Sequence, residues 1–267
     1  MARRTLTGLR VIVTGASSGI GRELVRQLIA AGASVVATAR RAERLEQLRQ
    51  ECSSPERLVI VVGDITEAAV RQHSIDVCLQ QFGGLDVLIN NAGMGALGSF
   101  ATSTADRLRQ VMEVNFFAPV EFIRQALPHL KAGNKPLIVN ISSVLGHRAV
   151  PGKSEYCASK FALHGFSDAL RAELAREKVD VLLVSPSTTQ SEFFEQALPA
   201  EPATNGSPAK PTAGQFGAMP AAKVARRTLR AMALGRHETI LSVGGTLLVW
   251  IDRLCPPLAN RLIAWFG

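Results

Sequence analysis

The sequence predicts an α/β protein built around a doubly wound parallel sheet with helices on both faces. Three observations lead to this prediction. Short β-branched runs alternate with amphipathic stretches along most of the chain, a glycine-rich turn follows the first of these runs, and 47% of the 267 residues are hydrophobic. This length suits one large core, so a single α/β domain fits the chain better than two separate domains.

Seven short runs rich in valine, isoleucine and leucine are expected to form the strands. They span residues 11–13, 35–38, 58–62, 87–90, 137–141, 181–185 and 239–241. The helices expected between them span residues 22–31, 42–50, 68–82, 107–130, 154–177 and 221–234. Strands that alternate with helices in this way form parallel sheets, and such sheets bind ligands at the carboxyl ends of their strands.

Two segments near the carboxyl terminus depart from this rhythm. Residues 199–220 hold prolines among glycines and small polar residues, so we expect 191–220 to form a mobile substrate loop. A surface insertion without a role is the alternative. Residues 244–267 form an apolar tail that contains both tryptophans. We expect this tail to pack in a subunit interface, and the alternatives are a cover over the substrate cleft and contact with a membrane surface.

Composition limits the functional classes. The net charge is +8, but the arginines are dispersed without interleaved aromatic residues, which argues against nucleic-acid binding. The 4 cysteines form no C-x-x-C pair, and no histidines stand at a metal-ligand spacing, so we expect reduced thiols and no metal site. No stretch approaches the ~20 apolar residues of a membrane span. These features predict a cytoplasmic protein, peripheral at a membrane at most.

The glycine-rich turn is the run TGASSGIG at residues 14–21. Its glycines let the backbone approach a ligand closely, while free N–H groups and the positive end of the following helix favour negative charge. The turn therefore predicts a bound dinucleotide pyrophosphate, and an ordinary tight turn is the alternative. The expected contacts are Gly15, Ser17, Ser18, Gly19, Ile20 and Gly21.

Arg40 and Arg41 follow the second expected strand, where a protein that binds NAD would hold the adenosine ribose with a carboxylate. A guanidinium binds phosphate through two parallel hydrogen bonds, so these arginines suit a 2′-phosphate. They predict NADP(H) as the cofactor. A basic helix start is the alternative.

Tyr156 is the only tyrosine in the chain, and Lys160 follows it by one helical turn. A phenol with a pKa near ~10 transfers protons poorly at neutral pH, and an ammonium group beside it is expected to lower that pKa. The pair predicts a proton-transfer site, with Ser142 and Ser143 just upstream. A surface pair without a role is the alternative.

Taken together, these motifs resemble those of the short-chain dehydrogenase/reductase superfamily over residues 9–243. The resemblance rests on the turn at 14–21, Asp64, the run Asn90-Asn91-Ala92-Gly93, Asn115, Ser142-Ser143, and Tyr156 with Lys160. It implies a Rossmann-like, seven-stranded parallel sheet. On this basis we expect residues 1–243 to form an NADP(H)-binding catalytic domain.

The resemblance also implies a role for each catalytic residue. Tyr156 would act as general acid or base, Ser143 would hold the substrate oxygen, and Asn115 would support a proton relay. Lys160 would lower the pKa of Tyr156 and bind the nicotinamide ribose. Tyr156 would also contact the cofactor. The other implied cofactor contacts are Asp64, Ile65, Asn91, Ala92, Gly93, Pro186, Thr189 and Ser191.

Some positions depart from the family pattern or invite other interpretations. Ser187 stands where the family usually has glycine, and Ser191 stands where it has threonine. Cys157 is interpreted as a small helix residue rather than a redox thiol, and His147 as a solvated loop histidine that could touch substrate.

The function expected from these features is hydride transfer between NADP(H) and a carbonyl/alcohol substrate, with reduction as the favoured direction. The apolar residues 94–100 suggest an uncharged or lipid-like substrate. A regulatory or scaffold protein that binds dinucleotide with little turnover is the main alternative, and a dehydratase or epimerase on the same fold is another. The family resemblance implies a homodimer or homotetramer.

Overall fold

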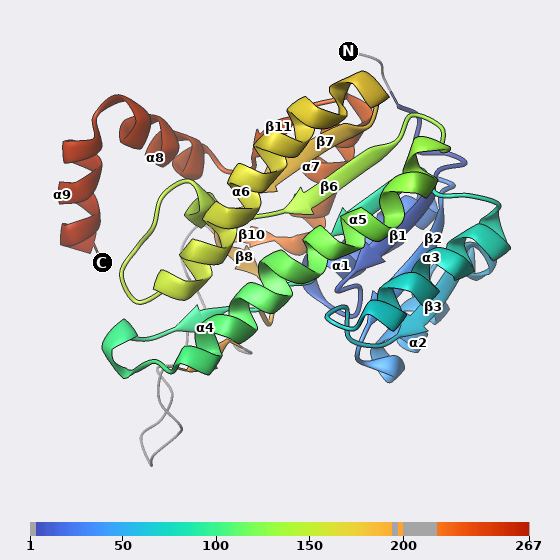
Figure 1. Cartoon of the computed structure of the whole chain (residues 1–267), viewed down its shortest axis with the longest axis horizontal. Helices are drawn as coiled ribbons and strands as arrows, with labels where there is room; N and C mark the ends of the chain where they lie inside the picture. Colours follow the sequence, from blue (N-terminus) through green and yellow to red (C-terminus); the bar gives the residue numbers. More distant parts are fainter. Residues whose placement is uncertain (1–3, 194–196, 200–217, 267) are drawn as a thin grey trace.

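A seven-stranded parallel sheet lies between two layers of helices (Figure 1). The structure is a computed structural model, and it describes residues 4–193, 197–199 and 218–266. The strands are β1 (Arg10–Thr14), β2 (Ser34–Ala39), β3 (Leu58–Val62), β4 (Val87–Asn90), β6 (Leu137–Ile141), β7 (Asp180–Ser185) and β11 (Glu238–Ile240). Their order across the sheet is β11-β7-β6-β4-β1-β2-β3, which confirms the predicted doubly wound fold.

The strand order reverses between β1 and β4, so the chain crosses to opposite faces on either side of this point. One face of the sheet is covered by α1 (Gly19–Ala30), α2 (Ala42–Glu51) and α7 (Ala221–Ala233). The other face is covered by α3 (Ala68–Phe82), α5 (Ala118–Lys131) and α6 (Ser154–Leu174). The carboxyl ends of β1 and β4 therefore open into a crevice between the helical layers.

Alternate side chains along each strand point into two separate hydrophobic cores, one on each face of the sheet. In β1, Val11 and Val13 belong to the core beneath α1 and α7, whereas Ile12 belongs to the core beneath α3 and α5. Because successive strand residues point to opposite faces, both faces of a central strand must be apolar. This explains why the strands read as continuous apolar runs in the sequence.

The helix expected over residues 107–130 is interrupted. It begins as α4 (Ala105–Met112), passes through a π-helical turn over Glu113–Phe117, and continues as α5. In this turn the N–H of Ala118 donates to the carbonyl of Glu113, five residues earlier. Hydrophobic spacing does not reveal such a turn, because the residues on either side still face the core.

Two short parallel strand pairs hold the ends of the predicted substrate loop. Strand β8 (Thr189–Gln190) pairs with β10 (Met219–Pro220), and β5 (Ala96–Leu97) pairs with β9 (Leu198–Pro199). These pairs were not expected from the sequence. Most of the predicted loop, 194–196 and 200–217, lies outside the described residues.

The apolar tail forms two helices, α8 (Val243–Leu254) and α9 (Pro256–Phe266), on the side of the molecule away from α2 and α3 (Figure 1). Arg148, in the loop between β6 and α6, donates to Asp252 at 2.8 Å and to Asn260 at 2.5 Å. Several apolar side chains of α8 and α9 are exposed: Val243, Leu247, Trp250, Leu254 and Leu258. Within the described part of the chain, no helix is long and apolar enough to cross a membrane.

Asp86 joins the amino ends of three central strands. Its carboxylate accepts hydrogen bonds from the N–H of Arg10 at 3.0 Å, the Arg10 guanidinium at 2.6 and 2.9 Å, and the N–H of Asn134 at 2.7 Å. Burial alone would raise the pKa of Asp86, but these hydrogen bonds hold the pKa below its usual value. The interaction fixes β1, β4 and the approach to β6 in one register.

We expect Asp86→Ala to destabilise the fold by about 3 kcal/mol or more, because it leaves the Arg10 guanidinium without its partner at a mostly buried site. Urea denaturation followed by circular dichroism would measure this change. Asp106→Ala is the matched control, since Asp106 pairs with Arg109 in an ion pair whose side chains are 96% and 75% exposed. Equal stability of the two variants would contradict the structural role of Asp86.

Candidate active site

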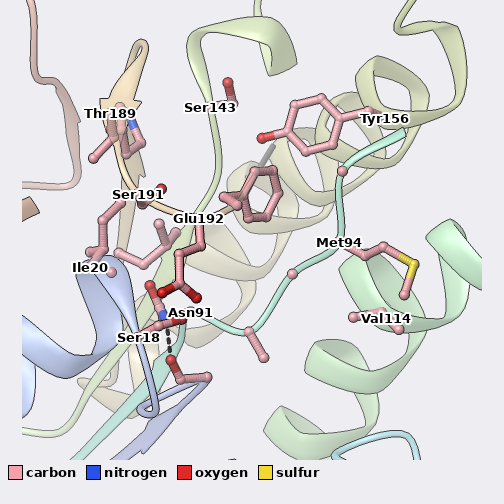
Figure 2. A pocket seen from close by; sticks show the side chains of 18 of the residues that line it. Ser18, Ile20, Asn91, Met94, Val114, Ser143, Tyr156, Thr189, Ser191 and Glu192 are labelled. Atoms are coloured by element: carbon pink, nitrogen blue, oxygen red, sulfur yellow. Dashed lines mark hydrogen bonds between the residues drawn. The ribbon is translucent and has the colours of Figure 1, made fainter. Parts of the chain in front are cut away.

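A cleft of about 410 Å³ opens at the carboxyl ends of the central strands (Figure 2). Of the residues predicted to bind cofactor or act in catalysis, all but Gly21 and Asn115 line it directly. Those two lie immediately behind the cleft wall, as the contacts below show. The structure therefore brings the predicted residues together in one place.

The glycine turn allows β1 and β4 to approach closely. A Cβ atom on Gly21 would lie 2.4 Å from the carbonyl oxygen of Gly15 and 2.4 Å from the side-chain nitrogen of Asn91. Gly15 has a φ of +65°, and its Cβ would lie 2.8 Å from Cα of Ala92. Larger residues at either position would push the turn away from the segment that follows β4.

Thr14 links the two sides of this turn, although the sequence analysis did not select it as a site residue. Its Oγ1 accepts hydrogen bonds from the N–H groups of Asn91 and Ala92, both at 2.9 Å. The side chain of Asn91 donates back to the carbonyl of Thr14 at 2.9 Å. The position of Thr14 at the start of the glycine motif was the available signal.

The amino end of α1 is suited to an anion. Its first turn contains no acidic residue, and Ser18 at the N-cap forms no side-chain capping hydrogen bond within the described residues. The first N–H groups of the helix and the positive end of its dipole thus face the cleft without a carboxylate from the helix itself. This geometry fits the predicted pyrophosphate contact.

Arg40 and Arg41 line the basic part of the cleft, and Arg44 lies next to it through Glu192. Arg41 donates to Ser17 at 3.0 and 3.1 Å and to Ser18 at 2.7 Å, which holds its guanidinium over the glycine turn. Arg41 also donates to the Glu192 carboxylate at 3.3 Å, and Arg44 donates to the same oxygen at 2.6 Å. The sequence analysis missed both Arg44 and Glu192.

Arg40 lies further from this cluster. Its side chain is 67% exposed and forms an ion pair with Asp64 at 3.6 Å. Of the two arginines predicted to select the cofactor, Arg41 is therefore the one held against the phosphate-binding turn. The hydrogen bond from Arg44 lowers the pKa of Glu192, so this carboxylate is charged at neutral pH.

Tyr156 lies at the other end of the cleft, beside Ser143 (Figure 2). Its ring meets that of Phe193 edge-on with 5.7 Å between centroids. The Lys160 ammonium lies 5.8 Å from the centroid of the tyrosine ring and donates to the carbonyl of Ile141 at 3.1 Å. Phe193 was not predicted from the sequence.

Burial governs the protonation of this pair. It raises the pKa of Tyr156 to about 12, against the opposing effect of the hydrogen bond to Ser143. It lowers the pKa of Lys160 to about 8. Burial therefore has the largest effect on the pKa of both groups, and the lowering of the Tyr156 pKa by Lys160 stays a prediction.

Asn115 lies in the π-helical turn and is 1% exposed. Its side-chain nitrogen donates to the carbonyl of Met94 and to the hydroxyl of Ser159, both at 2.9 Å, and its oxygen accepts from the N–H of Met94 at 2.7 Å. Ser159 in turn donates to the carbonyl of Tyr156 at 2.7 Å. Asn115 thus bridges the segment after β4 and the helix that carries Tyr156.

Two further interpretations from the sequence have different outcomes. The interpretation of His147 as a solvated loop histidine is wrong, because its side chain is 3% exposed and Nε2 lies 2.9 Å from the hydroxyl of Ser185. Helices α6 and α8, together with the edge of the sheet, enclose the loop that carries it. Cys157 is buried, and burial raises its pKa, so the thiol lacks the lowered pKa of a redox-active cysteine.

The cleft therefore combines an anion-binding end, formed by the glycine turn and Arg41, with a proton-transfer end formed by Ser143 and Tyr156. A sequence profile described as "short chain dehydrogenase" matches residues 10–202. The chain belongs to the short-chain dehydrogenase/reductase family. Membership makes it an oxidoreductase that depends on a nicotinamide dinucleotide.

A curated relative agrees with this assignment, and two solved structures show the same fold. The mouse protein "Dehydrogenase/reductase SDR family member 7B" is 34% identical over 260 residues, which cover 95% of this chain and 80% of the relative. A short-chain dehydrogenase/reductase from Burkholderia phymatum in complex with NAD has a TM-score of 0.82 at 24% identity, with 96% of each chain covered. A short chain dehydrogenase from Burkholderia cenocepacia in complex with NADP has a TM-score of 0.81 at 24% identity, with 97% and 99% covered.

We expect Gly21→Ala to weaken dinucleotide binding by at least about tenfold, because the added methyl group would force the turn away from Asn91 and misplace the N–H groups that hold phosphate. Isothermal titration calorimetry with NADPH and NADH would measure the two dissociation constants. Thermal denaturation of each variant would show whether it is folded.

Gly165→Ala in α6 is the matched control, since a Cβ atom at Gly165 would meet no other atom within 4 Å. This substitution should leave binding unchanged and stabilise the helix by roughly 0.5–1 kcal/mol. Undiminished dinucleotide binding by the Gly21→Ala variant would show that close approach at this turn is not required.

Proposed function

We propose that this enzyme transfers hydride between NADP(H) and a carbonyl or alcohol substrate, with Tyr156 as general acid or base. The observation that carries the proposal is the arrangement of Tyr156, Ser143 and Lys160 at one end of a cleft whose other end is basic. The bound nucleotide would supply or accept the hydride. The residues of the chain would bind the substrate oxygen and move its proton.

In the direction of reduction, Tyr156 would donate its phenolic proton to the substrate oxygen as negative charge develops there. Ser143 would donate a hydrogen bond to the same oxygen, as a preorganised donor. Burial raises the pKa of Tyr156, so the phenol is protonated at neutral pH and has a proton to donate. The preference for reduction stays a prediction.

Lys160 would stabilise the phenolate that remains after proton donation. A positive charge near the ring matters most at that stage, because the burial that raises the pKa of Tyr156 also strengthens charge interactions. Asn115 would position this pair, since it ties α6 to the segment that carries Met94. The predicted proton relay through Asn115 stays a prediction.

The preference for NADP(H) over NAD(H) is proposed from the arginines. Arg41 and Arg44 converge on one carboxylate oxygen of Glu192, so an anionic group between them is already favoured. A 2′-phosphate bound there would replace Glu192 as their partner. NAD(H) is the second candidate, because Glu192 could instead accept hydrogen bonds from ribose hydroxyl groups.

An uncharged carbonyl compound is the proposed substrate class. Apolar side chains line the part of the cleft around Tyr156: Met94, Val114, Val144, Leu145, Val150 and Phe193. Such a surface favours an apolar substrate with few polar groups, which includes lipid-like compounds. The exposed apolar residues of α8 and α9 support the proposal that the tail contacts another subunit or a membrane surface.

Several expectations from the sequence stay predictions. They are the cytoplasmic location, the homodimeric or homotetrameric state, and the lack of binding to nucleic acid. The scaffold and dehydratase or epimerase alternatives also remain to be separated from the proposal. Steady consumption of NADPH in the presence of a carbonyl substrate would exclude both.

We expect Tyr156→Phe to reduce turnover by at least about 100-fold while leaving NADPH affinity nearly unchanged, because only the proton donor is lost. NADPH oxidation over a panel of ketones and aldehydes would measure the rates, and calorimetry would measure the affinity. Phe166→Tyr, further along α6 and outside the cleft lining, serves as a control for the change of one hydroxyl group. Full activity of the Tyr156→Phe variant would exclude the proposed acid.

We expect Arg41→Ala to raise the dissociation constant of NADPH by roughly tenfold more than that of NADH, because one charge-assisted hydrogen bond to phosphate is removed. Glu192→Gln should lower the dissociation constant of NADPH, since the competing carboxylate is gone. Calorimetry with both nucleotides would measure these changes. Arg40→Ala, at the more exposed position, should have the smaller effect. Weaker NADH binding by the Glu192→Gln variant, with NADPH binding unchanged, would instead support NAD(H) as cofactor.

A further inference from the structure

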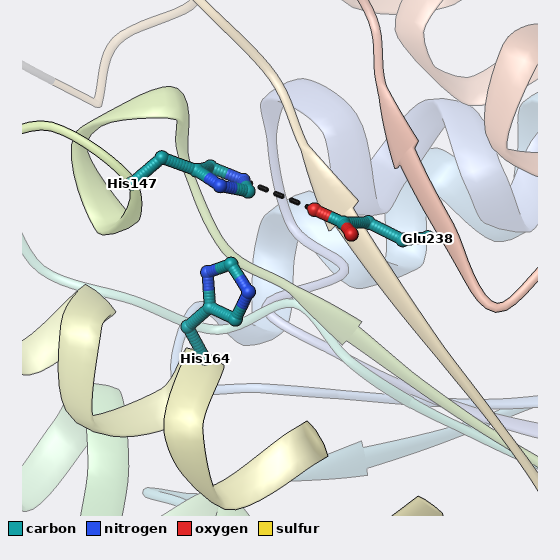
Figure 3. Close-up of side chains that lie close together, drawn as sticks. All are labelled: His147, His164 and Glu238. Atoms are coloured by element: carbon teal, nitrogen blue, oxygen red, sulfur yellow. Dashed lines mark ion pairs between the residues drawn. The ribbon is translucent and has the colours of Figure 1, made fainter. Parts of the chain in front are cut away.

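Three potential metal ligands from separate elements meet outside the cleft (Figure 3). His147 follows the 3-10 turn Val144–Gly146, His164 lies on α6, and Glu238 lies on β11. One ligand atom from each of the three lies within 4.8 Å of those of the other two. The rings of the two histidines are 4.4 Å apart between centroids, and His147 Nε2 is 3.4 Å from Glu238 Oε1.

We propose that His147, His164 and Glu238 form a binding site for a divalent transition-metal ion, with zinc as the best match. Two imidazole nitrogens and one carboxylate oxygen are ligands that zinc prefers. In a tetrahedral site with bonds of 2.0–2.1 Å, neighbouring ligand atoms lie about 3.3 Å apart. The distance between His147 and Glu238 already matches this value, so the site closes by a movement of His164 toward the pair.

The environment of Glu238 supports a cation between these residues. Its Oε1 atom is buried and accepts no hydrogen bond from any residue in the part of the chain that the structure describes. Buried carboxylate oxygens normally have a partner, so this atom requires an explanation. A metal ion held against His147 Nε2 would provide one.

His164 has the supporting contact that a metal-ligating histidine usually has. Its Nε2 lies 3.4 Å from the carboxylate of Asp168, one turn further along α6, which leaves Nδ1 for the metal. His147 Nε2 lies 2.9 Å from the hydroxyl of Ser185, and a metal ion bound to this nitrogen would replace that hydrogen bond. A carboxylate behind a histidine ligand orients the ring and makes it a stronger donor.

The charges around the site are compatible with a cation. Arg253 on α8 acts electrostatically on His147. Arg253 opposes a bound cation, while the carboxylates of Glu238 and Asp168 favour it. Glu238 is about one third exposed, so a water molecule can reach a fourth coordination position.

The site would connect two parts of the catalytic apparatus. His147 follows directly after the turn that begins at Ser143, and His164 lies one helical turn after Lys160. A metal ion bound by both would fix the loop of Ser143 against the helix of Tyr156. The sequence analysis expected no metal site, because the ligands are separated by 17 and 74 residues and form no spacing motif.

Zinc binding to the full chain tests this proposal. The protein would be treated with EDTA, dialysed, and titrated with Zn²⁺ by isothermal titration calorimetry, in a Cys255→Ser background because Cys255 is an exposed thiol. We expect one equivalent of zinc to bind. In both His164→Ala and Glu238→Gln, the dissociation constant should rise by at least about 100-fold. Co²⁺ in place of Zn²⁺ should give a visible absorption spectrum typical of tetrahedral coordination.

His73→Ala is the matched control, since this histidine is exposed on α3, and its zinc affinity should equal that of the parent. Added Zn²⁺ should raise the unfolding temperature of the parent and of His73→Ala, but not of the two ligand variants. Circular dichroism would confirm that each variant is folded. The absence of zinc binding by the parent, or binding that survives unchanged in either ligand variant, would overturn the proposal.

Discussion

The carboxylate of Asp86 accepts hydrogen bonds from Arg10 at the start of β1 and from the backbone just before β6. Asp86 itself stands directly before β4. One buried charge therefore sets the relative positions of three neighbouring parallel strands at their amino ends. Because each of these strands has only four or five residues, their carboxyl ends inherit the same register. The glycine turn, the segment after β4 and the Ser143 loop all begin from those ends.

At the carboxyl ends of β1 and β4, close approach of the backbones, rather than a buried charge, determines how the segments are positioned. Gly15 and Gly21 have no room for a side chain, and Thr14 holds the segment after β4 through two N–H groups. The backbone there is densely packed. The first turn of α1 and the Arg41 guanidinium are among the polar groups at this end of the cleft. The same packing thus shapes the wall and selects which groups reach the ligand.

Much of this arrangement could be predicted because it depends on local patterns. The seven strands follow from apolar runs, and the glycine turn, Ser143, Tyr156 and Lys160 follow from short motifs at strand ends. Arg44, Glu192 and Phe193 could not be found this way. Arg44 looks like any polar residue on a helix, and the roles of Glu192 and Phe193 depend on how the segment after β8 folds back over the cleft.

Other differences arise from tertiary burial. His147 reads as a polar residue in a loop, but α6, α8 and the sheet edge surround it. Burial also has the largest effect on the pKa of Tyr156, which it raises. The π-helical turn at Asn115 cannot be detected from the periodicity of hydrophobic residues, for a different reason. It changes the hydrogen-bond ladder without changing which residues face the core on either side.

That turn also affects how this region can tolerate changes in length. A π-helical turn contains one residue more than the α-helical path between the same two points. Deleting a single residue within Glu113–Phe117 would therefore restore a regular helix and keep both α4 and α5 in their packing registers. Asn115 would then lose the backbone position that directs its side chain toward Met94 and Ser159. Such a shortened chain would be a well-folded protein without its polar bridge to Tyr156, so insertion and deletion at this turn separate folding from function.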